Sequence, residues 1–585
     1  MIINLCLKLL AGALLLPLFT IPAKAQDNGD TEYVVLPFGE RGQIKMTYDA
    51  RQRPNCIFMD RKVHLAVNAG ADVGATGKSK STPMVVSYDL DQLSFSDFIV
   101  LGSKSSDHHD GPVIWADTEE KLHVFCGWHN DLGKHLAAKQ PGTVGSQRTD
   151  WFTSTPPGGK MAYPWVARIY NNQHMVFYRT DGHYSSWTYR ITSDNGISWD
   201  GPENDVIDLD QHLGMDTDWS VYTAKEISKD GKFLHVGFIA YDDYKRPRSP
   251  EELATGELDK TRQKNPLYDH RRVSYKYNLY YIKIDLRNHK VMNHTGDILE
   301  TPIDLACANE KCMIWDTQWR GSGIVPSMFV DDNDDVHFLH NISDFQHEDS
   351  LDYHYVRFED GAWKTTRITD SNHEWNSGYL TMDPDENLHA YIITGNGYFH
   401  SDGYMDKHGG GDIEEWISSD GGDSWNRSRS ISVDPDQFNG WKYNNIQPVR
   451  NPDGTTTPGM LLFYGWKHPD DPLSKAFLYL ELDVLRNTGT SMKVPLESNR
   501  TFTVSPNPAS GFLHINFPGN VIHQMKVYDL SGQLLDSQMI NSDQALVDIE
   551  HLEDGIYLLM AESNKGISTA KILKSKWGSG KKERL

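Results

Sequence analysis

The chain has 585 residues, with 80 acidic against 57 basic side chains, a formal charge of −23 and 11% aromatic residues. This acidity argues against a protein that coats nucleic acid or any other polyanion. An anionic ligand must instead be met by a local cluster of Arg, Lys and His. The length allows one large domain followed by a smaller one.

The N-terminus has the pattern of an export signal. Lys8 precedes an almost wholly apolar run over residues 9–20, which is followed by the small-x-small triplet AKA. This pattern predicts a signal peptide over residues 1–25 and a mature chain that begins at Gln26. The run is too short for a stable membrane span, and no later segment approaches about 18 apolar residues, so we expect an exported protein without a membrane span.

Four cysteines remain once the signal is removed. Cys307 and Cys312 are five residues apart, close enough for a small disulfide loop in an oxidising compartment. Two free buried thiols fit the sequence equally well.

A loose unit recurs along the chain, in which a polar turn leads into an alternating apolar strand with a histidine near its start. The histidines are His64, His123, His174, His235, His337 and His389. If the strand around Ile282 fills the one double step, the period is about 50 to 60 residues. Such a period, with four short strands per unit, is typical of a β-propeller blade. We therefore predict an all-β, seven-bladed β-propeller over residues 26–488, with eight blades as the alternative, and expect the repeat histidines to be structural.

Two further segments support this fold. TSDNGISW (192–199) and SSDGGDSW (418–425) fit the Asp-box hairpin of sialidase-type propellers. The Asp is expected to cap the turn, the Gly to adopt the left-handed conformation, and the Trp to pack back on the hairpin. The motif indicates a fold and says little about activity.

The pattern breaks near Leu485, where residues 489–500 have the composition of a linker. The motifs SPNPASG, VYDLSGQ and GIYLL then follow within residues 501–585, which end in a basic tail. This region resembles the C-terminal sorting domain of the type IX secretion system of Bacteroidota. The resemblance implies a small Ig-like β-sandwich, the type IX machinery as a partner, and a secreted or cell-surface protein.

Candidate catalytic residues lie in two segments. A polar loop carries His108 and His109, and a strand predicted over Leu122–His129 could return His129 close to that loop. In the second segment, Tyr163 opens one strand and Arg179 ends the next, so a hairpin can bring both to one rim of the propeller. Two imidazoles, a phenol and a guanidinium are the groups that β-elimination on a uronic acid requires. Cations neutralise the carboxylate, a base takes the C5 proton, and an acid protonates the O4 leaving group.

The segments around HDGP (109–112), LHVFCGWH (122–129), Tyr163-Pro164 and FYR (177–179) are similar to the BNR-repeat propeller polysaccharide lyases, specifically the ulvan lyases. The resemblance implies endolytic cleavage of ulvan, an anionic algal polysaccharide of sulfated rhamnose and uronic acid, leaving an unsaturated uronyl end. By resemblance, His109 and Tyr163 are the base and the acid, in either order, while His129 and Arg179 neutralise the carboxylate. The doubled His108-His109 leaves the alignment ambiguous by one residue, and the spacing to Pro112 favours His109.

Further residues are expected to line the substrate or hold a metal. The substrate-binding candidates are His108, Trp219, Tyr222 and Arg271. The chemistry requires no metal, but some relatives carry a structural zinc or calcium, for which His183 is the candidate ligand.

Two other functions fit the propeller. A sialidase-like glycoside hydrolase would share the Asp boxes, although the early Arg-Ile-Pro motif of sialidases is absent from the sequence. A non-catalytic surface glycan-binding propeller would need aromatic platforms but not Tyr163 together with Arg179.

Overall fold

The computed structural model describes the parts of the chain on which the following sections rest. These are residues 33–37, 56–73, 79–92, 94–103, 111–183, 185–210, 219–242, 276–318, 320–344, 350–395, 409–431, 433, 437–466, 475–481, 503–505, 509–517, 521–528, 534–552, 555–563 and 566–574. They fall in two compact units, one within residues 25–488 and one within residues 489–585. His108, His109 and Arg271 lie outside the described residues.

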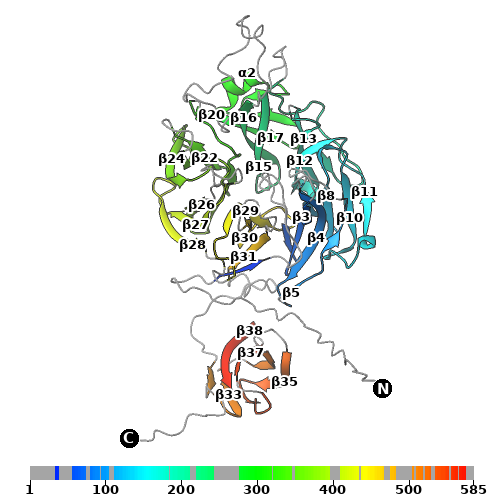
Figure 1. Cartoon of the computed structure of the whole chain (residues 1–585), viewed down its shortest axis with the longest axis vertical. Helices are drawn as coiled ribbons and strands as arrows, with labels where there is room; N and C mark the ends of the chain where they lie inside the picture. The colour runs from blue at the N-terminus through cyan, green and yellow to red at the C-terminus, as the bar shows by residue number, and fades with distance from the viewer. Residues whose placement is uncertain are drawn as a thin grey trace, which may run out of the picture. The chain divides into compact units, whose positions relative to one another are not determined.

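The larger unit is built almost entirely from antiparallel sheets, so the all-β prediction is confirmed. Six sheets follow one another around a centre (Figure 1). The first has nine strands, namely β1 (Tyr33–Pro37), β31 (Lys475–Glu481), β30 (Thr456–Trp466), β29 (Lys442–Arg450), β2 (Cys56–Met59), β3 (Lys62–Val73), β4 (Ser79–Asp89), β5 (Ser94–Phe95) and β6 (Ile99–Val100). The second contains β7 (Val113–Ala116), β8 (Lys121–Cys126), β10 (Lys134–Pro141) and β11 (Trp151–Ser154). The third contains β9 (His129–Asp131), β12 (Met161–Arg168), β13 (His174–Thr180) and β14 (Trp187–Thr192).

The remaining sheets of this unit come from the second half of the chain. The fourth contains β15 (Trp219–Ile227), β16 (Phe233–Asp242), β17 (Lys276–Asp285), β18 (Lys290–Met292), β19 (Ile298–Leu299) and β20 (Met313–Trp315). The fifth contains β21 (Ser327–Val330), β22 (Val336–Ser343), β23 (Leu351–Glu359) and β24 (Ala362–Ser371). The sixth contains β25 (Gly378–Met382), β26 (Leu388–Thr394), β27 (Asp412–Ser418) and β28 (Asn426–Ile431). A short helix, α2 (Leu305–Cys307), continues into a π-helical turn at Ala308–Cys312.

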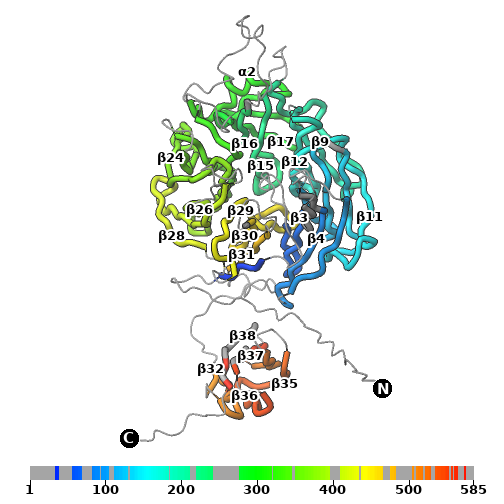
Figure 2. Tube along the Cα trace, in the orientation of Figure 1, coloured from blue at the N-terminus to red at the C-terminus, as the bar shows by residue number. Residues whose placement is uncertain are grey.

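The nine-stranded sheet joins the two ends of the unit. One parallel pair, Ile57 with Arg450, connects β2 to β29, and β1 pairs antiparallel with β31. Figure 2 shows β1 beside β31, although more than 400 residues separate them in sequence. The unit is therefore closed by strands from opposite ends of the chain.

The recurring histidine unit marks one position in each sheet. His64, His123, His174, His235, His337 and His389 lie on β3, β8, β13, β16, β22 and β26, each next to the strand nearest the centre. The assignment of the Ile282 strand to a unit of its own is wrong, because Ile282 lies on β17 and pairs with Val236 of β16. The long step in the repeat, from His235 to His337, arises from the segments that follow β16 and β17 in the chain.

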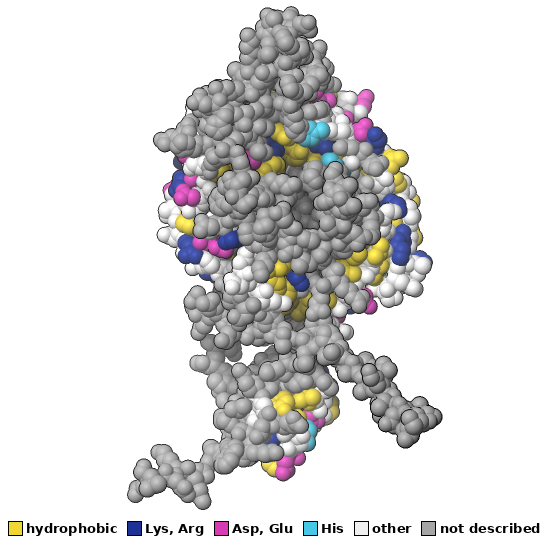
Figure 3. All heavy atoms as spheres, in the orientation of Figure 1, with side chains coloured by type: hydrophobic (Ala, Val, Ile, Leu, Met, Phe, Trp, Pro, Cys, Tyr) yellow, Lys and Arg dark blue, Asp and Glu magenta, His cyan; other side chains and the backbone are white. Residues whose placement is uncertain are grey.

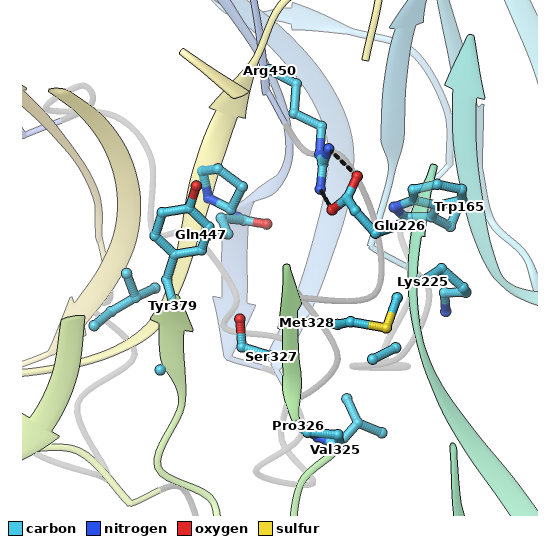
Figure 4. A pocket seen from close by; sticks show the side chains of 14 residues that line it. Trp165, Lys225, Glu226, Val325, Pro326, Ser327, Met328, Tyr379, Gln447 and Arg450 are labelled. Carbon is cyan, nitrogen blue, oxygen red and sulfur yellow. Dashed lines mark hydrogen bonds and ion pairs between the residues drawn. The ribbon is translucent and has the colours of Figure 1, made fainter. Parts of the chain in front are cut away.

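The strands nearest the centre, β12, β15, β21, β25 and β29, line a pocket (Figure 4). Across it, the Arg450 guanidinium donates to both carboxylate oxygens of Glu226, at 3.0 and 2.8 Å. This bidentate pair connects β29 to β15 and satisfies two charges that the centre would otherwise desolvate unpaired.

The smaller unit has two sheets around one core. They contain β32 (Thr503–Ser505), β33 (Phe512–Asn516) and β36 (Gln544–Asp548) in one, and β34 (Ile522–Tyr528), β35 (Leu534–Ser542), β37 (Gly555–Ser563) and β38 (Gly566–Lys574) in the other. Leu513 and Val547 of the first sheet and Val527 and Leu559 of the second are buried in the same hydrophobic cluster. Alternating apolar residues on both sheets therefore meet face to face.

Candidate active site

His129 reaches the site because the strand before it breaks. The predicted strand Leu122–His129 is wrong at its end: β8 stops at Cys126, and Gly127 takes a φ of 74°. Glycine adopts this left-handed conformation without the clash that a Cβ would cause. The chain turns there, and His129 begins β9, pairing with Ala162 of β12 in the next sheet. The turn thus places His129 opposite Ala162, the residue before Tyr163.

Tyr163 occupies a β-bulge. Ala162 pairs with Arg179 and Trp165 with Phe177, so Tyr163 and Pro164 together oppose the single residue Tyr178. Tyr163 has a φ of 55°, which is rare for a bulky residue and costs about 1–3 kcal/mol. Bulges re-aim side chains and are frequent next to active sites. Because of this strained conformation, the Tyr163 side chain departs from the regular alternation of side chains along the strand.

His129, Tyr163 and Arg179 form one group, which we name the Tyr163 cluster. The Tyr163 hydroxyl lies 3.4 Å from Nε2 of His129, and the two ring centroids are 5.5 Å apart. The guanidinium carbon of Arg179 lies 4.8 Å from the centroid of the Tyr163 ring. The sequence predicted Tyr163 and Arg179 on one hairpin, and the structure has His129 on a strand of the same sheet.

Arg179 is the most unusual member of the cluster. Its side chain is 0% exposed, and none of its three guanidinium nitrogens has a hydrogen-bond partner among the described residues. A buried charge without a hydrogen-bonded counter-ion costs several kcal/mol, so such groups are rare unless a ligand supplies the missing anion. The cation–π contact with Tyr163 offsets part of this cost. The arrangement is suited to receiving a carboxylate.

Aromatic rings extend the cluster across the fourth sheet. Tyr222 of β15 lies 5.8 Å from Tyr163, 5.7 Å from Tyr241 and 6.1 Å from His183, measured between ring centroids. Trp219, at the start of β15, is half-buried. The site predicted at Tyr163 is thus continuous with Tyr222 and lies near its strand neighbour Trp219.

Lys276 is a second buried cation that the sequence analysis missed. Its ammonium group lies 5.4 Å from the ring of Tyr222, 4.5 Å from Tyr241 and 4.3 Å from Trp375, and it donates to the carbonyl of Gly323. It is 3% exposed. A lysine that opens an apolar strand is usually solvated, so only the three-dimensional contacts identify it as part of the site.

His183 does not have the surroundings of a metal ligand in the described part of the chain. Its ring lies against Tyr222 and Tyr241, and the described residues contain no group of three or more His, Cys, Asp and Glu side chains able to hold a metal ion. The structural zinc or calcium expected from the sequence, with His183 as a ligand, therefore stays a prediction.

Three of the repeat histidines are each paired with an aspartate in the same way. These pairs lie at the ends of the strands opposite to the Tyr163 cluster. Asp117, Asp331 and Asp383 each lie six residues before a histidine and contact its Nε2, at 3.2 Å for His123, 3.5 Å for His337 and 3.2 Å for His389. Each aspartate also accepts backbone N–H groups of its own turn. The prediction that these histidines are buried or half-buried structural residues is confirmed for these three, which we name the turn histidines.

The Asp boxes are also structural. Asp194 accepts from the backbone N–H groups of Ile197 and Ser198, and Gly196 has a φ of 80°, as predicted. The indole N–H of Trp199 donates to the carbonyl of Thr155, beyond the end of β11 in the preceding sheet, and its ring contacts Trp115, Phe125 and His135 of that sheet. Trp199 therefore connects the third sheet to the second.

The four cysteines of the predicted mature chain, Cys56, Cys126, Cys307 and Cys312, are free thiols in the structure. Burial raises the pKa of Cys312 to about 12 and, less strongly, the pKa of Cys307. Of the two alternatives for Cys307 and Cys312, the structure has the pair of thiols.

Comparison with known proteins places this geometry in a family. Residues 77–371 match the family described as BNR repeat-containing family member. The chain belongs to the BNR repeat-containing family. Residues 503–575 match the secretion system C-terminal sorting domain, which confirms the predicted sorting domain and a secreted or cell-surface location for this BNR-repeat protein. Among the described residues, no helix has the length and apolarity needed to cross a membrane.

Curated relatives of this BNR-repeat protein include two ulvan lyases. The one from Alteromonas sp. (strain LOR) is 31% identical over 116 residues, which are 17% of this chain and 23% of the relative. The one from Nonlabens ulvanivorans is 22% identical over 237 residues, covering 38% of this chain and 46% of the relative. The chain thus matches less than half the length of either relative.

A solved structure of a PL25 ulvan lyase bound to -[GlcA(1-4)Rha3S]- aligns with a TM-score of 0.57. The alignment covers 78% of this chain and 99% of that chain, at 16% identity. At this identity the likeness concerns the fold alone. With the ring of sheets in Figure 1, it supports a propeller-like fold for the larger unit.

Proposed function

We propose that this BNR-repeat protein is an endolytic polysaccharide lyase that cleaves ulvan by β-elimination at the uronic acid. The observation that carries the proposal is the buried guanidinium of Arg179, which lies beside the Tyr163 phenol without a hydrogen-bond partner among the described residues. The class of substrate comes from the ulvan lyases that the chain resembles.

In the proposed reaction, a base removes the C5 proton of the uronic acid. The electron pair forms the C4–C5 double bond, the C4–O4 bond breaks, and O4 leaves with a proton from an acid. No water is consumed, and the new sugar end is an unsaturated uronyl group. The carboxylate on C5 must be neutralised, because its negative charge opposes the build-up of carbanion charge next to it.

Each member of the Tyr163 cluster has a role in this scheme. Arg179 and His129 neutralise the carboxylate, while Tyr163 and His109 act as base and acid, in either order. The guanidinium 4.8 Å from the Tyr163 ring favours the phenolate form that a base requires. The assignment of His109 rests on the sequence resemblance. Likewise, His108, Trp219, Tyr222 and Arg271 are proposed to contact the sugars.

The burial of the cluster sets the direction of approach. Tyr163 and Arg179 are 1% and 0% exposed, whereas His129 is half-buried. We therefore propose that the uronic acid enters past His129 and meets the guanidinium last. Exclusion of water from such a site strengthens the charge interactions within it.

The domain organisation supports the same proposal. We propose a propeller of seven blades over residues 26–488, since the nine-stranded sheet divides into two groups at the single β2–β29 pair and five further sheets follow. Residues 489–500 are then the linker and residues 501–585 an Ig-like sorting domain for type IX export. The signal peptide over residues 1–25 completes this division.

The experiment is to incubate the mature protein with ulvan and follow ultraviolet absorbance from the conjugated double bond. We expect absorbance to rise as the chains shorten, and Tyr163→Phe to lower turnover by about 10²–10⁴-fold while the protein stays folded. Shorter chains without new absorbance would indicate a sialidase-like hydrolase. Binding with neither change would indicate a non-catalytic glycan-binding propeller. Full activity in Tyr163→Phe would contradict the assignment of the base and acid.

A further inference from the structure

Trp187, the first residue of β14, lies next to the Tyr163 cluster and is fully buried. Its indole ring is nearly parallel to the Tyr163 ring, with an interplanar angle of 15° and 6.4 Å between centroids, and to the Phe177 ring, at 20° and 5.6 Å. In the strand register it is directly opposite Arg179. Residues opposite each other in an antiparallel pair have adjacent side chains on one face. Trp187 therefore adjoins two of the three members of the Tyr163 cluster.

The indole of Trp187 is itself held from two directions. Its N–H donates to the carbonyl of Val221 on β15 at 3.0 Å, which connects the third sheet to the fourth. The Lys225 ammonium lies 4.9 Å from the centroid of the indole and donates to the carbonyl and the hydroxyl of Thr223, at 3.0 and 2.9 Å. A buried ring that is fixed by a hydrogen bond and by a cation has little rotamer freedom, so it can keep a neighbouring side chain in place.

Tyr163 needs such a support because its backbone is strained. A tyrosine with a φ of 55° relaxes towards the ordinary β region unless its surroundings prevent this change. The Tyr163 ring also lies 5.8 Å from the ring of Tyr222. Val221, which accepts the indole N–H, directly precedes Tyr222 on β15. The indole of Trp187 is thus in a position to set both the orientation of Tyr163 and its distance from Tyr222.

A substitution of Trp187 leaves the surface of the protein intact. On the face drawn in Figure 3, acidic and basic side chains lie around the outer part of the larger unit. The Trp187 side chain is 0% exposed, so its replacement does not alter these charges. Any effect on the reaction must therefore pass through the groups that the indole contacts.

We propose that Trp187 is a positioning residue of the active site, whose indole holds the Tyr163 phenol in the place from which it exchanges a proton with the substrate. The inference rests on the proposed function for the reaction, and it adds a residue that does not itself contact the sugar. Misplacement of a reacting group by about 1 Å can lower a rate about 10²-fold, so the loss of such a support is measurable in kcat. Because Trp187 acts through Tyr163, its loss should leave KM nearly unchanged.

The first test compares two substitutions of Trp187 in the full chain by absorbance kinetics on ulvan. Trp187→Phe keeps a ring but loses the N–H, and should lower kcat about tenfold. Trp187→Leu also loses the ring, and should lower kcat about 10²-fold. In both variants KM should change by less than about twofold.

The matched control for these variants is Trp151→Phe. Trp151 is also buried, and its indole N–H donates to the carbonyl of Val144 at 2.8 Å, within the part of the unit that contains the second sheet. We expect Trp151→Phe and Trp187→Phe to lose similar stability in urea unfolding, while only Trp187→Phe loses kcat. Equal kcat in the two variants would reduce Trp187 to a structural residue and overturn the proposal.

A double substitution tests whether Trp187 acts through Tyr163. In a chain that already carries Tyr163→Phe, the addition of Trp187→Phe should lower the remaining kcat by less than about twofold, because the hydroxyl that the indole positions is gone. A loss of the same size in both backgrounds overturns the proposal.

Crystal structures of the parent and of Trp187→Leu separate this proposal from the proposed function. We expect the φ of Tyr163 to return to negative values in the variant, and its hydroxyl to move away from Nε2 of His129, from which it lies 3.4 Å in the parent. If the parent produces no absorbance on ulvan, the proposed function fails, and a displaced Tyr163 still shows that Trp187 positions it. A Tyr163 that keeps its place in the variant overturns the proposal. Should Trp187→Leu not fold, Trp187→Phe carries both measurements.

Discussion

The two ends of the strands differ in how their polar and charged side chains are hydrogen-bonded. At one end, each turn histidine contacts an aspartate six residues before it, and that aspartate also accepts backbone N–H groups. At the other end, the Tyr163 cluster holds a buried guanidinium without a hydrogen-bond partner among the described residues, beside a tyrosine in a strained backbone conformation. Satisfied groups stabilise the fold, whereas unsatisfied and strained groups are retained where they serve a ligand. Both ends contain histidines, so the presence of a histidine does not by itself tell a structural position from a candidate catalytic one.

The largest expected effect comes from removing the unsatisfied charge. Arg179→Met should lower kcat by about 10²–10³-fold, because the substrate carboxylate then lacks its main cation. The same change should leave the free energy of unfolding unchanged or raise it by about 1 kcal/mol, since an apolar side chain replaces a desolvated charge. Absorbance assays and urea unfolding measure the two effects. A large loss of stability would show that Arg179 is a structural residue.

Removing a hydrogen-bonded aspartate at a turn should have the opposite effect, because it should lower stability and leave turnover unchanged. Asp117→Ala removes the acceptor of His123 and of two backbone N–H groups and should lower the free energy of unfolding by about 2 kcal/mol. Turnover per folded molecule should not change, since Asp117 lies at the far end of the strands. Loss of turnover without loss of stability would remove the distinction between the two ends.

Low pH should first destabilise the end of the strands that carries the turn histidines. Burial lowers the pKa of His135 to about 3 and that of His174 to about 4, and it also lowers the pKa of His123. Because the unfolded chain binds these protons near pH 6.5, their contribution to stability is full above pH 6.5 and falls as the pH drops towards 4.

His389 has the opposite sign. Glu415 and Asp383 outweigh burial and raise its pKa, so its contribution is full below pH 6.5 and falls as the pH rises through that raised value. Urea unfolding at pH 7.5 and pH 5 should show lower stability at pH 5, since burial also lowers the pKa of His64, His294 and His354, and six histidines then act against one. Equal or greater stability at pH 5 would contradict this balance.

The smallest effect should come from an exposed pair. Lys229 and Asp332 form an ion pair in which both side chains are more than half exposed. Asp332→Asn should change the urea midpoint by less than the error of the measurement, because solvent and salt screen the pair. A clear shift would mean that pairing of charge matters even without burial.

The sequence predicted the fold well because strand periodicity and turn composition are local properties. The histidine strands, the Asp boxes and the position of Tyr163 and Arg179 on one hairpin all followed from spacing. The spacing did not predict that Gly127 would transfer His129 to the next sheet, since a single left-handed residue leaves the alternation around it intact. Lys276 was missed for another reason: its role depends on rings that are distant in sequence.

The pairing of β1 with β31 has a consequence for export. Tyr33–Pro37 leaves the ribosome first but has no partner strand until Lys475–Glu481 has been synthesised. The ring can therefore close only when both ends of the unit are present, and any chain shortened at either end of the ring exposes an unpaired strand edge. Such an edge would favour association between chains, so passage through a secretion pathway is simplest when both ends arrive together on the far side of the membrane.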